Sequence, residues 1–224
     1  MRQTALVLAW ACVALHANAA PADVGTRCDF GAFVNESDPA GLNVRSAPAA
    51  SAKVLGRLPP SYANPAMNGY RVKVEVDVLG SRNGWFLITN AQDNEALTEK
   101  AARSMYHGRG WVYGRKLTVK SQARKGRAQP DPRSEVVFST ASVDSFDNDE
   151  MVDAGALLAC SGKWALVELD RSKLSGTDEE LKIAPSARSG LSRGRFRTWL
   201  NQICNIQETS CSGLGGEDEE LPPR

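Results

Sequence analysis

The stretch GLNVRSAPAASAKVLGRLPP, residues 41–60, predicts a strand, a turn and a returning strand. Leu42 and Val44 alternate with polar residues, so we expect both side chains to face a core. Pro48 and the small residues around it favour a turn. Arg45 has two candidate roles, because its guanidinium either braces this turn or reaches a ligand. The stretch therefore predicts a β-hairpin and leaves its binding role open.

Short strand patterns continue along the chain. RVKVEVDVL, residues 71–79, alternates valine with charged residues and predicts a strand with one buried face. Further strand candidates are GWFLI, GWVYG, EVVF, KWALVEL and RTWLNQI. Many short strands separated by glycine and proline predict an all-β fold of small barrels or sandwiches.

The two halves of the chain share three sequence matches in the same order, at offsets of 75, 79 and 88 residues. The matched segments are LNVRS (42–46) with LTVKS (117–121), GSRNGWFLI (80–88) with CSGKWALVEL (160–169), and GRGWVYGRKL (108–117) with GRFRTWLNQIC (194–204). An ordered set of this kind predicts a domain of about 90 residues that occurs twice.

The first copy resembles the bacterial SH3-like domain, through GLNVRSAP, AKVLGRL, NGWFLI and GRGWVYGRKL. The resemblance implies two tandem SH3-like small barrels, over residues 28–118 and 119–211. The second copy departs from the family pattern, because Lys120 stands in place of the arginine and Trp199 has no glycine before it.

Both copies contain insertions. In the first, residues 91–107 are rich in helix-forming types, and Leu97, Ala101 and Met105 have helical spacing, so we expect a short helix there. In the second, residues 170–195 are polar, and we expect a mobile loop.

The N-terminal 20 residues have the features of a secretory signal peptide. Arg2 precedes an apolar run over residues 5–15, and Ala17-Asn18-Ala19 fits a cleavage site. The run is shorter than the roughly 20 residues that cross a bilayer. We therefore expect cleavage after Ala19 or Ala20, a secreted or periplasmic protein, and no membrane span. The acidic tail, residues 212–224, is expected to be disordered.

Four cysteines remain after removal of the signal peptide, which contains Cys12: Cys28, Cys160, Cys204 and Cys211. An even number in an oxidising compartment predicts two disulfides, with three pairings open. Zinc is a weaker interpretation, because the chain has no Cys-x-x-Cys motif.

The residues for common hydrolytic sites are scarce. His107 is the one histidine outside the signal peptide, and neither G-x-S-x-G nor H-E-x-x-H occurs. The acidic runs at 147–150 and 177–180 are more typical of solvated loops than of paired catalytic carboxylates. We therefore expect no catalytic residue, no metal and no cofactor.

Charge is balanced, with 27 Lys and Arg against 26 Asp and Glu, so nucleic acid is not an expected partner. One basic run, residues 114–127, joins the two predicted copies and contains Arg115, Lys116, Lys120, Arg124, Lys125 and Arg127. This run is either a solvated surface or a contact for an anionic polymer.

Aromatic residues and one arginine are the remaining candidates for ligand binding. An SH3-type barrel can present flat side chains along a groove. The candidates are Arg45, Trp85, Tyr106, Trp111 and Tyr113. The alternative for Trp85 and Trp111 is packing in a small core, because each opens a strand.

The sequence thus predicts a secreted, non-enzymatic binding or adaptor protein. The resemblance implies peptidoglycan stem peptide, or another envelope protein, as the ligand. The alternative is a periplasmic regulator or inhibitor that binds a protein partner through the inserted helix or the long loop. The oligomeric state is open.

Overall fold

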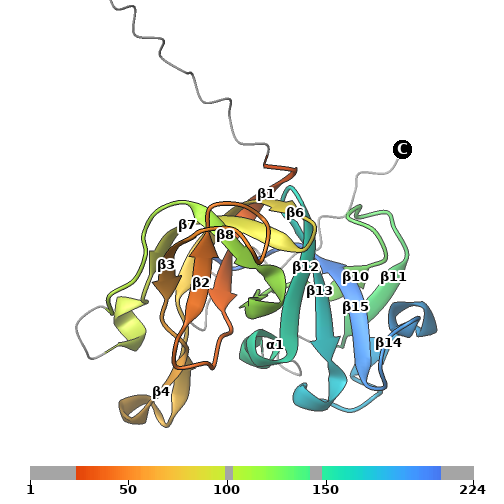
Figure 1. Cartoon of the computed structure of the whole chain (residues 1–224). Coiled ribbons are helices and arrows are strands. Elements are labelled where there is room, and N and C mark those ends of the chain that lie inside the picture. Colours follow the sequence, from red (N-terminus) through yellow and green to blue (C-terminus); the bar gives the residue numbers. More distant parts are fainter. Residues whose placement is uncertain (1–23, 99–102, 142–147, 208–224) are drawn as a thin grey trace, which may run out of the picture.

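The computed structural model describes residues 24–98, 103–141 and 148–207. The predicted signal peptide (1–20) and acidic tail (212–224) lie outside these residues. The fold is all-β, as predicted, and consists mainly of two antiparallel sheets that lie side by side (Figure 1). No helix in the described ranges is long and apolar enough to cross a membrane.

The first sheet takes its strands from the N-terminal half. In spatial order they are β3 (Val54–Leu58), β2 (Leu42–Arg45), β8 (Gly110–Tyr113), β7 (Trp85–Gln92), β6 (Glu75–Arg82), β1 (Thr26–Val34) and β9 (Leu117–Thr118). A separate hairpin, β4 (Tyr62–Asn64) and β5 (Tyr70–Val72), projects below this sheet in Figure 1, with a 3-10 turn, η1 (Pro65–Met67), between its strands.

The second sheet takes its strands from the C-terminal half. Their order is β12 (Gly155–Ser161), β13 (Trp164–Asp170), β15 (Arg195–Leu200), β10 (Lys125–Arg127), β11 (Val136–Thr140) and β14 (Leu181–Ile183). A short helix, α1 (Asn148–Ala154), leads directly into β12, and further 3-10 turns are η2 (Glu95–Leu97), η3 (Gly114–Lys116), η4 (Arg171–Lys173) and η5 (Pro185–Arg188).

The two sheets contain the same run of five strands. The order β3-β2-β8-β7-β6 corresponds to β11-β10-β15-β13-β12. Trp111 pairs with Arg45 on one side and Leu87 on the other, and Trp199 pairs in the same way with Arg127 and Leu166. Two of the three sequence matches therefore fall at equivalent strand positions.

The third match, LNVRS with LTVKS, is wrong. Residues 117–118 form β9, which pairs with β1 at the far edge of the first sheet. The counterpart of Arg45 is Arg127 rather than Lys120, since Arg127 lies opposite the second tryptophan. The second copy therefore keeps an arginine at this position.

One hydrophobic core runs through both halves of the chain. Phe30, Phe86 and Ile88 of the first sheet belong to the same cluster as Phe138 and Phe196 of the second. The last two rings stack with centroids 5.4 Å apart. Because apolar burial is the main stabilising contribution in folding, a continuous core joins the two sheets into one folded body.

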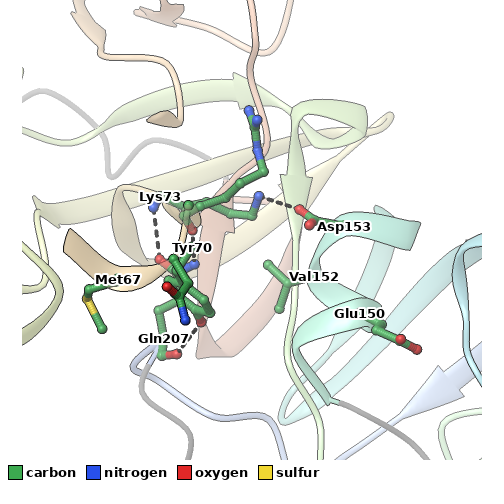
Figure 2. Close-up of a pocket in the computed structure, with 10 residues that line it drawn as sticks. Met67, Tyr70, Lys73, Glu150, Val152, Asp153 and Gln207 are labelled. Carbon is green, nitrogen blue, oxygen red and sulfur yellow. Dashed lines mark hydrogen bonds and ion pairs between the residues drawn. The ribbon is translucent and has the colours of Figure 1, made fainter. Parts of the chain in front are cut away.

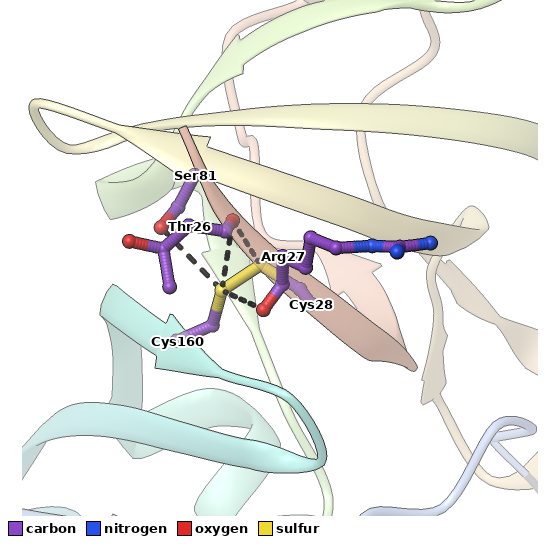
Figure 3. Close-up of a disulfide and its surroundings, with 5 residues drawn as sticks. All are labelled: Thr26, Arg27, Cys28, Ser81 and Cys160. Atoms are coloured by element: carbon purple, nitrogen blue, oxygen red, sulfur yellow. Dashed lines mark hydrogen bonds between the residues drawn. A yellow bond between two sulfur atoms is a disulfide. The ribbon is translucent and has the colours of Figure 1, made fainter. Parts of the chain in front are cut away.

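A disulfide between Cys28 and Cys160 also joins the halves (Figure 3). It links the start of β1 to β12 across 132 residues of sequence, with Cα atoms 5.7 Å apart. Beside it, Gly162 exchanges two backbone hydrogen bonds with the β1 segment. One of the two predicted disulfides therefore pairs Cys28 with Cys160. Cys204 is buried, and Cys211 lies outside the described residues, so a Cys204–Cys211 bridge stays a prediction.

The segment after β15, residues 201–207, runs back to the first sheet, and we call it the C-terminal strap. The Asn205 side chain accepts a hydrogen bond of 2.9 Å from the backbone N–H of Gly31. A Cβ at Gly31 would lie 2.6 Å from the Asn205 Cα, so only glycine allows this approach. The last described residue, Gln207, is also buried.

Three local expectations need correction. Residues 71–79 are not one half-buried strand, because the chain breaks between β5 and β6, and Lys73 and Glu75 are buried together with the valines. In the described part of the insertion, residues 91–98 and 103–107, the one helical element is the 3-10 turn η2, while residues 99–102 of the predicted helix lie outside the described residues. Residues 170–195 contain β14 and two 3-10 turns rather than a loop alone, because β14 pairs with β11.

Candidate functional site

Arg45 braces its own hairpin. Its Nη1 donates to the backbone carbonyl of Ala52, 2.8 Å away. Arg127 repeats the contact in the second sheet, where its Nη1 donates to the carbonyl of Ser134 at 3.0 Å. Both bonds span seven residues and close the same kind of loop. The hydrogen bond gives each arginine a structural role that needs no ligand.

The aromatic candidates differ in exposure. Trp111 is buried, with 4% of its surface exposed, between its strand neighbours Arg45 and Leu87. Tyr113, two residues further along β8, is 41% exposed. It lies against Trp85 with ring centroids 5.6 Å apart and the planes tilted by 51°. This is the geometry that aromatic pairs favour.

Strand register places four of the five predicted ligand residues on one face of the first sheet. Arg45 lies opposite Trp111, and Tyr113 lies opposite Trp85. Tyr106 is elsewhere. Its side chain lies over Gly56 and Gly108, where added Cβ atoms would meet the ring at 2.6 Å and the hydroxyl at 2.5 Å, and it packs against the core. Its hydroxyl donates to the carbonyl of Arg109 at 3.2 Å.

A pocket that the sequence did not predict lies where the two halves meet. It has a volume of about 520 Å3, and we call it the junction pocket. One side is formed by the β4–β5 hairpin and the C-terminal strap, and the other by α1 (Figure 2). Its main side chains are Met67, Tyr70, Arg71, Lys73, Glu150, Asp153 and Gln207.

Lys73 is the central charge of the junction pocket. Its side chain is only 1% exposed, and its ammonium donates to Asp153 Oδ1 at 2.6 Å (Figure 2). A weaker contact of 3.5 Å joins it to Asn35. Burial lowers the pKa of Lys73, and the ion pair with Asp153 opposes this effect. Asp153 is half exposed, so its carboxylate also faces the pocket.

Gln207 fixes the wall beside Lys73. Its side-chain oxygen accepts from the Lys73 backbone N–H at 2.8 Å, and its side-chain nitrogen donates to the Arg71 carbonyl at 2.5 Å. Its backbone N–H donates to the buried carboxylate of Glu75 at 2.7 Å, and its carbonyl accepts from the Tyr70 hydroxyl at 3.1 Å. These bonds hold the pocket wall in place before any ligand arrives.

Part of the junction pocket had a sequence signal. Lys73 and Glu75 stand between valines in a strand pattern, and a charged residue in such a position is buried whenever both faces are covered. No sequence pattern predicted the role of Gln207, which lies more than 130 residues away. The covering group comes from a part of the chain with no local relation to the strand.

The other candidates that the structure describes make local contacts. His107 Nδ1 lies 2.8 Å from the Ala91 carbonyl. Glu180 of the second acidic run receives a backbone hydrogen bond from Thr177, as in a local turn, and part of the first run lies outside the described residues. No group of three or more potential metal ligands occurs within residues 24–98, 103–141 and 148–207.

No protein-family model matches the chain, and no curated protein or solved structure matches it. The geometry of the chain itself therefore carries the functional proposal.

Proposed function

We propose that this chain is an exported, non-enzymatic binding protein that recognises short peptides of mixed charge. The junction pocket is the observation that carries this proposal. Its lining combines two cationic side chains, Arg71 and Lys73, with two carboxylates, Glu150 and Asp153. A ligand with both carboxylate and ammonium groups can pair with such a lining, whereas a ligand of one sign meets repulsion.

The geometry suits a peptide in further respects. Met67 and Tyr70 add apolar surface beside the charges, and both side chains lie on the hairpin side of the pocket (Figure 2). The pocket volume, about 520 Å3, falls in the range of small-ligand sites. The Gln207 hydrogen bonds pre-organise the wall, which lowers the entropy cost of binding. Together with the SH3-like resemblance, this favours peptidoglycan stem peptide, which is zwitterionic, as the ligand.

An envelope protein is the second candidate partner, and the pair of exposed Tyr113 and half-buried Trp85 favours it. Tyrosine and tryptophan are enriched at protein interfaces, because they bury large areas at low entropy cost. The pair lies on a different part of the molecule from the junction-pocket lining, since it belongs to β7 and β8. The two candidates can therefore be tested by separate variants.

Titration with a purified disaccharide-tetrapeptide from peptidoglycan tests the first candidate. We expect Arg71→Gln to weaken binding about tenfold, the size expected for one charge-assisted hydrogen bond. Arg133→Gln is the control, because Arg133 is also an exposed arginine but does not line the pocket. Trp85→Ala combined with Tyr113→Ala should leave this affinity unchanged.

The outcomes separate the candidates. If the aromatic double variant loses binding and Arg71→Gln does not, the ligand occupies the exposed face of the first sheet and the junction-pocket proposal is wrong. If the unsubstituted protein shows no interaction with the fragment or with intact sacculi at low and moderate salt, wall recognition is wrong. Co-purification of one envelope protein that is lost in the aromatic variant would support the second candidate.

A further inference from the structure

A second pocket, of about 380 Å3, is lined by residues from both halves of the chain. We call it the arginine pocket. Its side chains come from separate elements: Arg115 from η3, Glu168 from β13, and Arg195 and Arg197 from β15. The loop before β15 completes it with Gly190, Leu191 and Ser192. The basic run at the junction thus meets the arginines of the second half, which are distant in sequence.

A buried carboxylate positions two of the arginines. Glu168 Oε1 accepts from Arg115 Nη1 at 3.2 Å, and Oε2 accepts from Arg197 Nε and Nη2 at 2.9 and 2.7 Å. Burial raises the pKa of Glu168, but the bonds from Arg197 and Arg115 outweigh it and leave the pKa below its ordinary value. The carboxylate is therefore ionised at neutral pH.

The arginines keep much of their surface open to solvent. The side chains of Arg115, Arg195 and Arg197 are 46%, 38% and 43% exposed, while Glu168 is 9% exposed. Arg195 reaches Asp170 at 3.4 Å, and Asp170 is outside the pocket lining. The lining thus holds three cations and one anion, a net charge of +2.

We propose that the arginine pocket binds a phosphate group. A phosphate monoester carries a charge of about −1.5 to −2 at pH 7, which complements a lining with three arginines. The guanidinium fork presents paired N–H donors that match phosphate oxygens. Gly190 has φ +70° and no atom within 4 Å of the position of a Cβ, so the loop leaves room on this side.

This site is independent of the peptide proposal, because none of its residues lines the junction pocket. The shared chemistry is a terminal phosphate, and its source is either free phosphate or a phosphorylated envelope polymer. Titrating the 15N-labelled chain, without its predicted signal peptide, with inorganic phosphate and with glycerol 3-phosphate distinguishes these sources. We expect amide shifts at residues 190–192. Tighter binding of glycerol 3-phosphate indicates a polymer-borne group, and equal binding indicates that phosphate alone is recognised.

Ligand titration supplies an internal test. The second pKa of a phosphate monoester lies near 6, so the affinity for glycerol 3-phosphate should rise several-fold between pH 5 and pH 7.5. The lining itself has no group expected to titrate there, because arginines stay charged and Glu168 has a lowered pKa. Sulfate, a dianion throughout this range, should bind with unchanged affinity.

Variants decide whether these residues are responsible. Arg115→Gln and Arg195→Gln should each weaken phosphate binding about tenfold, while Arg133→Gln, away from the pocket, should not. Amide spectra of each variant show whether it folds, and a variant that does not fold is replaced by the corresponding lysine substitution, which keeps the charge and removes the fork. The proposal is overturned if neither inorganic phosphate nor glycerol 3-phosphate shifts the amide signals of residues 190–192. It is also overturned if Arg133→Gln weakens binding as much as Arg115→Gln and Arg195→Gln.

Discussion

The two sheets share one strand order but fill their cores with different residues. In the first sheet Gly56 lies opposite Val44, and in the second Phe138 lies opposite Gly126. The first sheet has Tyr106 lying over Gly56, whereas the second has Phe138 stacked on Phe196. One inserted tyrosine thus fills the space in the first sheet that two phenylalanines fill in the second.

The two sheets also differ in which of two facing strands carries a glycine and which carries a larger residue. A Cβ at Gly110 would lie 2.3 Å from a Val44 methyl group, and a Cβ at Gly126 would lie 2.1 Å from the Thr198 hydroxyl. The large and small members of this pair are therefore reversed between the sheets. Cores tolerate such exchanges when total volume is kept. Strand pairing is thus retained between the two sheets where the side chains are not.

The largest expected effect in this comparison comes from truncating a core ring. Phe138→Ala should lower the free energy of unfolding by about 3–5 kcal/mol, because it leaves a cavity in a fully buried site. Tyr106→Ala should cost less, since Tyr106 is only partly buried. Urea unfolding of both variants measures the difference. A larger loss for Tyr106→Ala would show that the two fillings are not equivalent.

Reversing the small and large pair of the second sheet should have the next largest effect. Gly126→Val should destabilise by about 1–3 kcal/mol through overpacking against Thr198. Adding Thr198→Gly recreates the arrangement of Val44 and Gly110, so it should recover part of that loss. A double-mutant cycle by urea unfolding gives the coupling. Additive costs would contradict the proposed equivalence.

The ion pairs of Glu168 in the second sheet should make stability depend on pH. Glu168 forms ion pairs with Arg115 and Arg197, and its folded-state pKa lies below its ordinary value of 4.5. Its contribution is therefore complete above that pH and is lost as the pH falls through the folded-state pKa. Glu168→Gln should cost about 1–2 kcal/mol at pH 7 and should flatten the stability profile below pH 5. An unchanged acid limb would mean that other carboxylates determine it.

The smallest effects should come from the two hairpin arginines. Arg45→Ala and Arg127→Ala each remove one hydrogen bond to a carbonyl seven residues away, so each should cost about 1 kcal/mol. Thermal unfolding of the pair checks this equality. If Arg45→Ala leaves stability unchanged but weakens binding of a wall fragment, Arg45 contacts the ligand instead of bracing the loop.

Much of the strand content was predictable because alternation and turn residues are local signals. The second hairpin was misplaced for an identifiable reason. LTVKS looks like LNVRS letter by letter, but the true counterpart keeps spacing instead: Arg45, Pro48 and Val54 correspond to Arg127, Pro130 and Val136, each 82 residues later. The spacing reflects the arginine brace, and a comparison by spacing could have found it.

The sites were less predictable than the strands. Trp85 and Tyr113 were among the candidates because an SH3-type barrel can present aromatic side chains along a groove, and the structure pairs them. The junction pocket depends on Gln207, Asp153 and the β4–β5 hairpin, which have no sequence relation to one another. The arginine pocket was visible only in part, as the basic run that contains Arg115. Convergence of distant segments was the missing information.

The C-terminal strap has a consequence for biogenesis. The contacts of Asn205 with Gly31 and of Gln207 with Lys73 join residues 174 and 134 positions apart, among the longest-range contacts in the fold. While the chain is made from its N-terminus, the part of the first half that the strap covers stays exposed until residues 201–207 emerge. Contacts between residues so far apart in sequence form slowly, because the entropy cost of closing a long loop comes before the contact stabilises the chain. Packing of the first half is therefore completed only by residues 201–207, more than 130 positions after the residues that they contact.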